Sequence, residues 1–521
     1  MITRLLRLLF TLTLAFVATV PFTRAADDSP TFVVEKTVIP SPASASPSAY
    51  VSNPQFAQSP DGTIYLSWLE ASHTSHFTRL CLARYLPEKQ AWSPPSVVAQ
   101  LPPSDARMAY ALATGPDHRF AVLLQENSRT FALTTSTDSG ATWTKAIPLD
   151  LALQNQSPRI PILRSLADGR LLAVWLNDAA TPSNTPRINS PARSAAATAR
   201  ASLYVRFLDA ELKSPAQLIE TPVSSGSEPD LVAFPDGSAL LAWRGLSADG
   251  AHDIRTARFD DGKWQPPATL NPDNWHLATP PADGPVLASR GAHLSAAWFT
   301  ATYNAQVNVS GSSNAGTQWF TPNRVDDIDP LGRPSLVMLD DGSSLVSWVE
   351  QGKTSETVFL RRLSAHGGLS VPVRLAENIT GHPRIVRVKD GDSTPAQLLL
   401  LTTPSPSSTR FGNSSPPLAT TLITLPDSSL LAEADLCGCD PRPEDQRGYP
   451  FRGRISAIDP KAGTITIAHA AIPGIMKAAT TVFQADPVLL ADLKPGMTLF
   501  ARTERLGPDW RFFAPRVLVV P

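Results

Sequence analysis

The chain has few cysteines, almost no net charge and few long apolar runs. It holds only three cysteines in 521 residues, which is too few for a disulfide scaffold even in an oxidising compartment. Its formal net charge is −1 and 17% of its residues are charged, so the clustered basic face of a nucleic-acid-binding protein is not predicted. No apolar run beyond Val20 is long enough to cross a membrane.

The N-terminus has the pattern of a secretory signal. Arg4 and Arg7 precede an apolar run that extends to about Val20, and small residues suitable for cleavage follow up to Ala25. We therefore expect residues 1–25 to be a signal peptide and the mature protein to be periplasmic or secreted. No cysteine stands immediately after the expected cleavage site, so a lipid anchor is not predicted, and no membrane span is expected after cleavage.

A hairpin pattern recurs along most of the chain, which also contains 50 prolines. The segment Leu339–Glu350 reads as an apolar strand, an Asp-Gly turn and a second apolar strand with a tryptophan. This pattern predicts a β-hairpin because glycine adopts the positive φ that the turn requires. Seven copies are present, with their turns at Asp61-Gly62, Asp117-His118, Asp168-Gly169, Asp236-Gly237, Arg290-Gly291, Asp341-Gly342 and Asp390-Gly391. The second strands carry tryptophans at Trp68, Trp175, Trp243, Trp298 and Trp348.

Third and fourth apolar runs follow most hairpins, so each unit has the four antiparallel strands of a propeller blade. The seventh unit lacks a clear fourth strand, and we expect residues 31–39 to supply it and to close the ring without an open edge. The predicted fold is all-β. A propeller is expected over residues 30–427, with seven repeat units or, alternatively, six blades. A linker at 428–448 and a small five-stranded OB-like barrel at 449–521 follow.

Two short motifs suggest a relationship to known propellers. Ser136–Trp143 matches the pattern S-x-D-x-G-x-x-W at every fixed position, and Ser312–Trp319 repeats it with Asn314 in place of the aspartate. These segments resemble the Asp-box of sialidase and BNR-repeat propellers. The resemblance implies a sialidase-like propeller, but the box residues hold a turn and do not indicate catalysis.

The predicted blade topology separates a structural face from a ligand-binding face. The Asp-Gly turns and Asp-boxes lie on one face, whereas the ends of the second strands and the crossings between blades lie on the other, which we call the mouth. Loops held by a rigid scaffold commonly carry binding residues. We therefore expect a polar ligand site at the mouth, a solvated rim being the alternative, formed by Glu70, Glu126, Asp178, Arg244, Asn274, Trp275, Asp283, Asp326, Asp327, Arg333 and Glu350. The crossings at the same mouth also carry His382 and Arg384.

The resemblance to sialidases implies an arginine cluster for a substrate carboxylate, an acid/base aspartate and a tyrosine activated by a glutamate. Arg159-Ile160-Pro161 resembles the Arg-Ile-Pro motif of these enzymes, although here it follows the first Asp-box instead of preceding it. No Tyr–Glu pair can be chosen from the sequence. The candidate catalytic residues are Arg159, Arg244, Arg333, Arg384 and Glu350.

The stretch from Arg244 to Glu350 also resembles a group of secreted bacterial sialidase-like proteins. The shared segments are His252–Arg255, Asp273–Trp275, Asp283–Pro285, Ala297–Ala301, and Val325–Asp327 through Pro330–Arg333. Relatives of this type carry cysteines before the fourth hairpin and near the Gly-Pro turn, and this chain has none there. A redox or metal role at those two positions is therefore not expected.

The C-terminal segment resembles CusF-like periplasmic copper-binding domains over the run from Ile465 to Phe483. In that family a histidine and two methionines bind Cu(I), as soft ligands do. Here His469 occupies the histidine position, but Ala479 and Thr481 replace the methionines. Copper is the cofactor that this resemblance implies, and the barrel is predicted to bind it weakly at most. The candidate ligands are His469, Met476, Cys437 and Cys439.

The favoured function from sequence is that of a binding module, with a glycan or protein ligand at the propeller mouth. Exo-sialidase-type glycoside hydrolysis and periplasmic copper handling are the two alternatives.

Overall fold

The computed structural model describes residues 34–519 except for short stretches at 44–48, 73–76, 102–108, 126–129, 152–157, 179–199, 210, 278–281, 303, 327–329, 353–354, 365–368, 371, 389–395, 406–417, 426–448, 470–475 and 507–508. The expected signal peptide, Glu126, Asp327, Cys437 and Cys439 lie outside the described residues. Within these ranges no helix has the length and apolar character needed to span a membrane.

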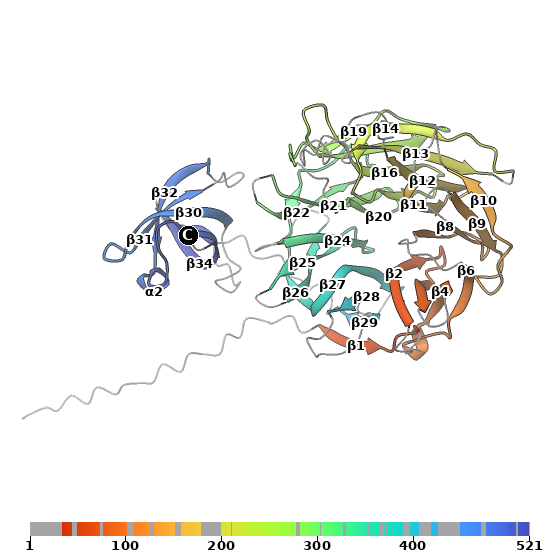
Figure 1. Cartoon of the computed structure of the whole chain (residues 1–521), viewed down its shortest axis with the longest axis horizontal. Helices are drawn as coiled ribbons and strands as arrows, with labels where there is room; N and C mark the ends of the chain where they lie inside the picture. Colours follow the sequence, from red (N-terminus) through yellow and green to blue (C-terminus); the bar gives the residue numbers. More distant parts are fainter. Residues whose placement is uncertain are drawn as a thin grey trace, which may run out of the picture. The chain divides into compact units, whose positions relative to one another are not determined.

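The first three hairpin repeats each form one antiparallel sheet, and the sheets follow one another in chain order (Figure 1). The first sheet contains β2 (Ala49–Gln58), β3 (Ile64–Ser72), β4 (Phe77–Leu86), β5 (Ala91–Trp92) and β6 (Ser96–Leu101), with the short 3-10 helix η1 (Pro87–Lys89) between β4 and β5. The second contains β7 (Tyr110–Thr114), β8 (Phe120–Gln125), β9 (Thr130–Ser136) and β10 (Ile147–Asp150). The third contains β11 (Pro158–Ser165), β12 (Leu171–Asp178), β13 (Arg200–Leu208) and β14 (Gln217–Ser224).

The fourth and fifth repeats have the same order of strands. The fourth sheet contains β15 (Asp230–Ala233), β16 (Ala239–Arg244), β17 (Ile254–Asp260), β18 (Lys263–Trp264) and β19 (Ala268–Asn271). The fifth contains β20 (Val286–Arg290), β21 (His293–Thr300), β22 (Gln306–Ser312) and β23 (Asn323–Arg324).

The last two repeats share one seven-stranded sheet. It contains β24 (Pro330–Met338), β25 (Ser344–Gln351), β26 (Glu356–Leu363), β27 (Val373–Val388), β28 (Gln397–Pro404), β29 (Ala419–Thr424) and β1 (Glu35–Ile39). The first part of β27 pairs with β26 and its second part pairs with β28. The described propeller therefore has six sheets for seven repeats, one fewer than the repeat count, because β27 is continuous from the sixth repeat into the seventh.

The ring of repeats is closed as the sequence predicted. The first strands of the repeats contact one another in the order β2, β7, β11, β15, β20, β24 and β27, and β27 contacts β2. The strand β1 pairs with β29, with Glu35 opposite Thr424 and Ile39 opposite Thr420. The N-terminal strand thus completes the last repeat and covers its edge.

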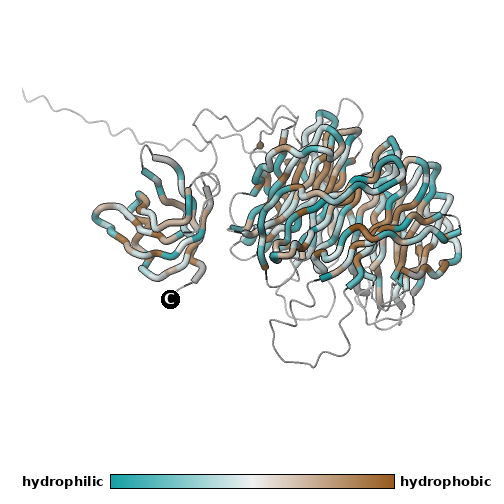
Figure 2. Tube along the Cα trace, turned by 90° about the horizontal axis from the view of Figure 1, so that it is seen from above, coloured by the Kyte–Doolittle hydropathy of each residue, from teal (hydrophilic) through white to brown (hydrophobic). Residues whose placement is uncertain are grey.

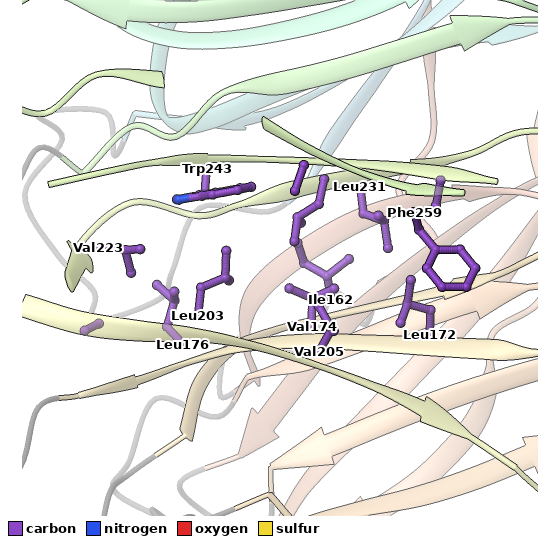
Figure 3. Close-up of a cluster of buried hydrophobic side chains, with 14 of the residues drawn as sticks. Ile162, Leu172, Val174, Leu176, Leu203, Val205, Val223, Leu231, Trp243 and Phe259 are labelled. Atoms are coloured by element: carbon purple, nitrogen blue, oxygen red, sulfur yellow. The ribbon is translucent and has the colours of Figure 1, made fainter. Parts of the chain in front are cut away.

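The sheets bury both of their faces against neighbouring sheets. Figure 3 shows one such interface, where Leu172 and Val174 of β12 face Leu231 and Trp243 of the fourth sheet. Figure 2 shows hydrophobic segments within the strands and hydrophilic segments at many turns. The five hairpin tryptophans noted in the sequence are at most 1% exposed, so they are core residues.

The two motif turns are held by hydrogen bonds within the turn. Oδ1 of Asp138 accepts the N–H of Thr142 at 2.9 Å, and Oδ2 accepts its hydroxyl at 2.6 Å. These bonds lower the pKa of Asp138 to about 2. In the second motif, Oδ1 of Asn314 accepts the N–H of Gln318 at 2.9 Å. An amide oxygen accepts a backbone N–H as a carboxylate does, so the substitution preserves the turn.

The C-terminal segment is a closed five-stranded barrel, which confirms the predicted architecture. Its strand order is β30-β31-β32-β34-β33. The elements are β30 (Tyr449–Asp459), β31 (Thr464–His469), β32 (Ala479–Ala485), the short helix α2 (Pro487–Leu490), β33 (Thr498–Leu506) and β34 (Asp509–Val519). Its core includes Phe451, Ile465, Phe483 and Phe512, each of which is 0% exposed. The helix α2, which the sequence reading did not predict, begins where Asp486 accepts the N–H of Val488 at 2.9 Å.

Candidate functional site

A group of charged side chains meets at the predicted mouth, where strand ends and blade crossings converge. Its members come from five segments of the chain: the β14–β15 crossing, the β19–β20 crossing, β24, β26 and β27. We call this group the mouth cluster, and it consists of Glu228, Asp283, Arg333, Glu356, His382 and Arg384.

Asp283 and Arg333 connect two of these segments. Oδ2 of Asp283 accepts the backbone N–H of Arg333 at 2.8 Å. The guanidinium of Arg333 donates to both carboxylate oxygens of Glu356, from Nη2 to Oε1 at 3.2 Å and from Nη1 to Oε2. Nη1 also donates to the carbonyl of Gly381 at 3.1 Å. Two of the sequence segments shared with sialidase-like proteins, at Asp283 and Arg333, therefore meet in space.

Arg384 and His382 complete the cluster from β27. Nη2 of Arg384 lies 3.6 Å from Oε2 of Glu228, in an ion pair that solvent reaches. Burial by the surrounding protein, followed by the nearby Arg384 guanidinium, lowers the pKa of the His382 imidazole, although the residue as a whole is exposed to solvent. His382 is therefore predominantly neutral at pH 7.

Two glycines allow these segments to approach one another. A Cβ on Gly284 would lie 1.7 Å from the carbonyl oxygen of Glu228. Gly332 has a φ of 88°, and a Cβ there would lie 2.1 Å from Oδ2 of Asp283. Only glycine fits these positions without displacing the cluster.

Arg244, a predicted ligand and catalytic candidate, instead holds the protein backbone. Its side chain is 1% exposed. Nε and Nη2 donate to the carbonyl of Asp283 at 3.2 and 3.0 Å, Nη2 also to the carbonyl of Phe299 at 2.7 Å, and Nη1 to the carbonyl of His252 at 3.0 Å. Burial lowers its pKa to about 10, against the opposing effect of nearby aspartates. With most of its N–H groups in use, Arg244 positions the Asp283 crossing and is poorly placed to bind a carboxylate ligand.

Trp275 and Asn274, also predicted mouth residues, lie beside Arg244. The guanidinium carbon of Arg244 lies 4.9 Å from the centre of the Trp275 ring, and Trp275 is 3% exposed. The backbone N–H of Asn274 donates to Oδ1 of Asp253 at 2.7 Å. Burial raises the pKa of Asp253. These contacts join the segments around residues 252 and 274. Trp275 is therefore a core residue, whereas Asn274 is exposed.

The remaining predicted residues are each paired locally. Arg159 donates to the carboxylate of Asp178 and to the carbonyl of Ser225, and burial raises the pKa of Asp178. The other three carboxylates are at most 5% exposed. Their pairs are Glu70 with Arg79 at 2.9 Å, Asp326 with Arg324, and Glu350 with the indole N–H of Trp348 at 2.9 Å.

Glu228 and Glu356 belong to the cluster but were not among the predicted residues. Glu356 is the first residue of β26, at the same end of the blade as the last residues of β25. The topological rule that selected second-strand ends also applies to third-strand beginnings, so it would have identified Glu356. Glu228 lies in the β14–β15 crossing, which the same rule assigns to the mouth, but only its closeness to Gly284 and Arg384 places it in the cluster.

A hollow of about 630 Å³ lies at the opposite, turn-bearing end of the third and fourth sheets. Its carboxylates serve their own turns: Oδ2 of Asp168 accepts from Nε of Arg170 at 2.6 Å, and Oδ1 of Asp236 accepts from Oγ of Ser238 at 2.6 Å. These contacts agree with the structural role expected for the Asp-Gly face.

In the barrel, His469 lies in an apolar and aromatic setting. It is 6% exposed, and its Nε2 lies 2.8 Å from Oγ1 of Thr481. Met476, the second described candidate ligand, is partly buried against the barrel core. Among the residues that the structure describes, no group of three or more His, Cys, Asp or Glu side chains is arranged to hold a metal ion.

Comparison with known protein families gives a match for the C-terminal barrel but not for the whole chain. The family model described as copper binding periplasmic protein CusF matches residues 448–509. The barrel is similar to CusF. This finding supports the resemblance seen in the sequence, although it covers only the C-terminal part. No curated protein matches the chain.

Several solved structures resemble the chain at low identity. They include a fungal alcohol oxidase of the AA5 family in complex with copper, which is 11% identical with a TM-score of 0.45 and covers 94% of this chain and 100% of its own. The GH93 α-L-arabinofuranosidase of Fusarium graminearum is 12% identical with a TM-score of 0.37, covering 72% and 92%. The intramolecular trans-sialidase from Ruminococcus gnavus is 10% identical with a TM-score of 0.38, covering 72% and 94%. Similarities this low do not transfer an activity.

Proposed function

We propose that the propeller binds a neutral, polyhydroxylated ligand, a glycan, at the mouth cluster. The observation that carries this proposal is the convergence of charged side chains from five chain segments, linked through Asp283, Arg333 and Arg384. Carboxylates accept hydrogen bonds and guanidinium groups donate them, so together they match hydroxyl groups, which do both.

The charge of the cluster favours a neutral ligand over an acidic one. Its three carboxylates, two guanidinium groups and neutral imidazole give a formal charge of about −1. Each guanidinium already has a carboxylate partner, Arg333 with Glu356 and Arg384 with Glu228. An acidic sugar would have to displace these partners, whereas a hydroxyl group can share them.

Sialidase-type hydrolysis is less well supported for the same reason. Arg159 is paired with Asp178, and Arg244 is engaged by backbone carbonyls. The similarity of the barrel to a family of periplasmic proteins supports the expectation that binding takes place outside the cytoplasm.

The test is a glycan array followed by calorimetric titration of the full chain with the best neutral and sialylated oligosaccharides. Glu356→Gln and Arg384→Gln should each weaken binding of the neutral ligand by about tenfold, equivalent to about 1.4 kcal/mol. Arg170→Gln is the matched control, because Arg170 forms a similar ion pair at the opposite end of the propeller.

Three results would oppose the proposal: binding of sialylated ligands alone, release of sialic acid from an aryl sialoside, or equal affinity of all three variants.

A further inference from the structure

We infer that the C-terminal barrel has kept the fold of a copper-binding domain but not its metal site, and that a hydrogen bond between His469 and Thr481 joins β31 to β32 in the metal's place. This inference concerns the barrel alone and does not depend on the ligand proposed for the propeller mouth.

The position of His469 is fixed by strand pairing. It is the last residue of β31, and Ala479, the first residue of β32, is its partner in the register. Two residues further along β32, the hydroxyl of Thr481 lies 2.8 Å from Nε2 of His469. Both positions that resemble the methionine sites of the family are therefore close to His469, but one offers a methyl group and the other a hydroxyl that is bonded to the imidazole.

Aromatic rings hold the imidazole in place. The ring of His469 lies edge-on to Phe451 and to Phe483, with both centroid separations 5.7 Å. These two phenylalanines stack on each other at 5.1 Å. The ring is thus part of the core, and the hydrogen bond to Thr481 satisfies a polar atom that would otherwise be buried at a cost.

The donor set does not fit Cu(I). Soft thioether and thiolate ligands select this ion, and neither Ala479 nor Thr481 supplies one. Met476 is partly buried against the core, and the described barrel residues contain no cluster of three potential ligands. A single imidazole already engaged by a hydroxyl is a poor site, so the barrel is expected to fold without metal. Folding of metal-dependent domains, by contrast, is coupled to binding.

The first experiment measures Cu(I) uptake by the full chain against a chromophoric Cu(I) chelator. Cys437→Ser and Cys439→Ser are included in every protein so that thiols do not bind the ion. This background chain should take up no Cu(I) that depends on His469. Adding Ala479→Met and Thr481→Met should give uptake of one ion per chain, and His469→Ala should abolish that uptake.

The second experiment tests the hydrogen bond through hydrogen–deuterium exchange of peptides covering β31 and β32. Thr481→Val should speed exchange there several-fold. Thr480→Val is the matched control, because Thr480 is exposed on the same strand, and it should leave the exchange unchanged.

The inference fails if the background chain binds one Cu(I) and loses it with His469→Ala. It also fails if the double methionine variant has the circular dichroism spectrum of the folded background chain yet binds no copper, or if Thr481→Val and Thr480→Val exchange alike.

Discussion

Replacing Gly332 by alanine is expected to destabilise the propeller and to disturb the mouth cluster. Gly332 has a φ of 88°. A Cβ at this position would lie 2.1 Å from Oδ2 of Asp283 and 2.9 Å from Cγ of Phe299. The same oxygen of Asp283 accepts the backbone N–H of Arg333, so the carboxylate cannot move away without weakening that bond.

Two free-energy costs determine how far Gly332→Ala destabilises the protein. A residue with a Cβ in the left-handed region costs about 1–2 kcal/mol. Forcing an extra carbon into a packed region costs about 1–3 kcal/mol more. The free energy of unfolding should therefore fall by about 2–5 kcal/mol, of which only the second contribution reports on the contacts around Asp283.

Gly169→Ala separates the two contributions. Gly169 has a φ of 82°, but nothing lies within 4 Å of a Cβ built there, so this variant should lose only about 1–2 kcal/mol. Urea unfolding followed by tryptophan fluorescence compares the two, since every tryptophan except Trp510 lies within residues 30–427.

Equal losses for the two variants would refute the reasoning, because they would mean that the space next to Gly332 is as open as that next to Gly169. The same pair also tests the site. Gly332→Ala should weaken ligand binding at the mouth, whereas Gly169→Ala should not.

Three further predictions concern buried polar groups. Trp348→Phe should lower the free energy of unfolding in urea by about 1–3 kcal/mol more than Trp175→Phe, because only the Trp348 indole donates to a buried carboxylate, that of Glu350; equal losses would contradict this. Burial lowers the pKa of His252 below its ordinary value of 6.5, so the unfolded chain takes up the proton at a higher pH than the folded protein. The free energy of unfolding should therefore fall as the pH drops below 6.5, by at most about 1.4 kcal/mol per pH unit. His252→Gln should remove this part of the slope in denaturation curves measured from pH 8 to 5, and an unchanged slope would exclude His252 as its source. Asn177→Leu removes an amide that is 0% exposed and makes no hydrogen bond in the described part of the chain, so stability should be unchanged or slightly raised; a loss above about 2 kcal/mol would indicate that a bound water satisfies the amide.

The fold could be predicted because its signals are local. Each Asp-Gly turn and the two strands around it are set by neighbouring residues, so the hairpins can be located from the sequence alone. The pairing of β1 with β29 was also predictable, because the last repeat lacked a strand and the first residues after the expected signal offered one. The number of sheets was not, since nothing in the sequence shows that β27 continues from one repeat into the next.

The candidate site was predictable as a location but not as a set of partners. The topological rule placed Asp283, Arg333 and Arg384 at one mouth, and the structure brings them together. It did not distinguish them from Arg244, whose pattern in the sequence is the same but whose donors are used by backbone carbonyls.

The sequence by itself determined the repeat, the face on which polar side chains gather, and the presence of Ala479 and Thr481 in the barrel. Those features depend on spacing and residue type, which the chain carries along its length. Only the tertiary structure decided which guanidinium binds which carboxylate, and that His469 donates to or accepts from Thr481. Such pairs depend on distances of a few ångströms between residues from separate strands, and those distances are fixed only when the sheets pack against one another.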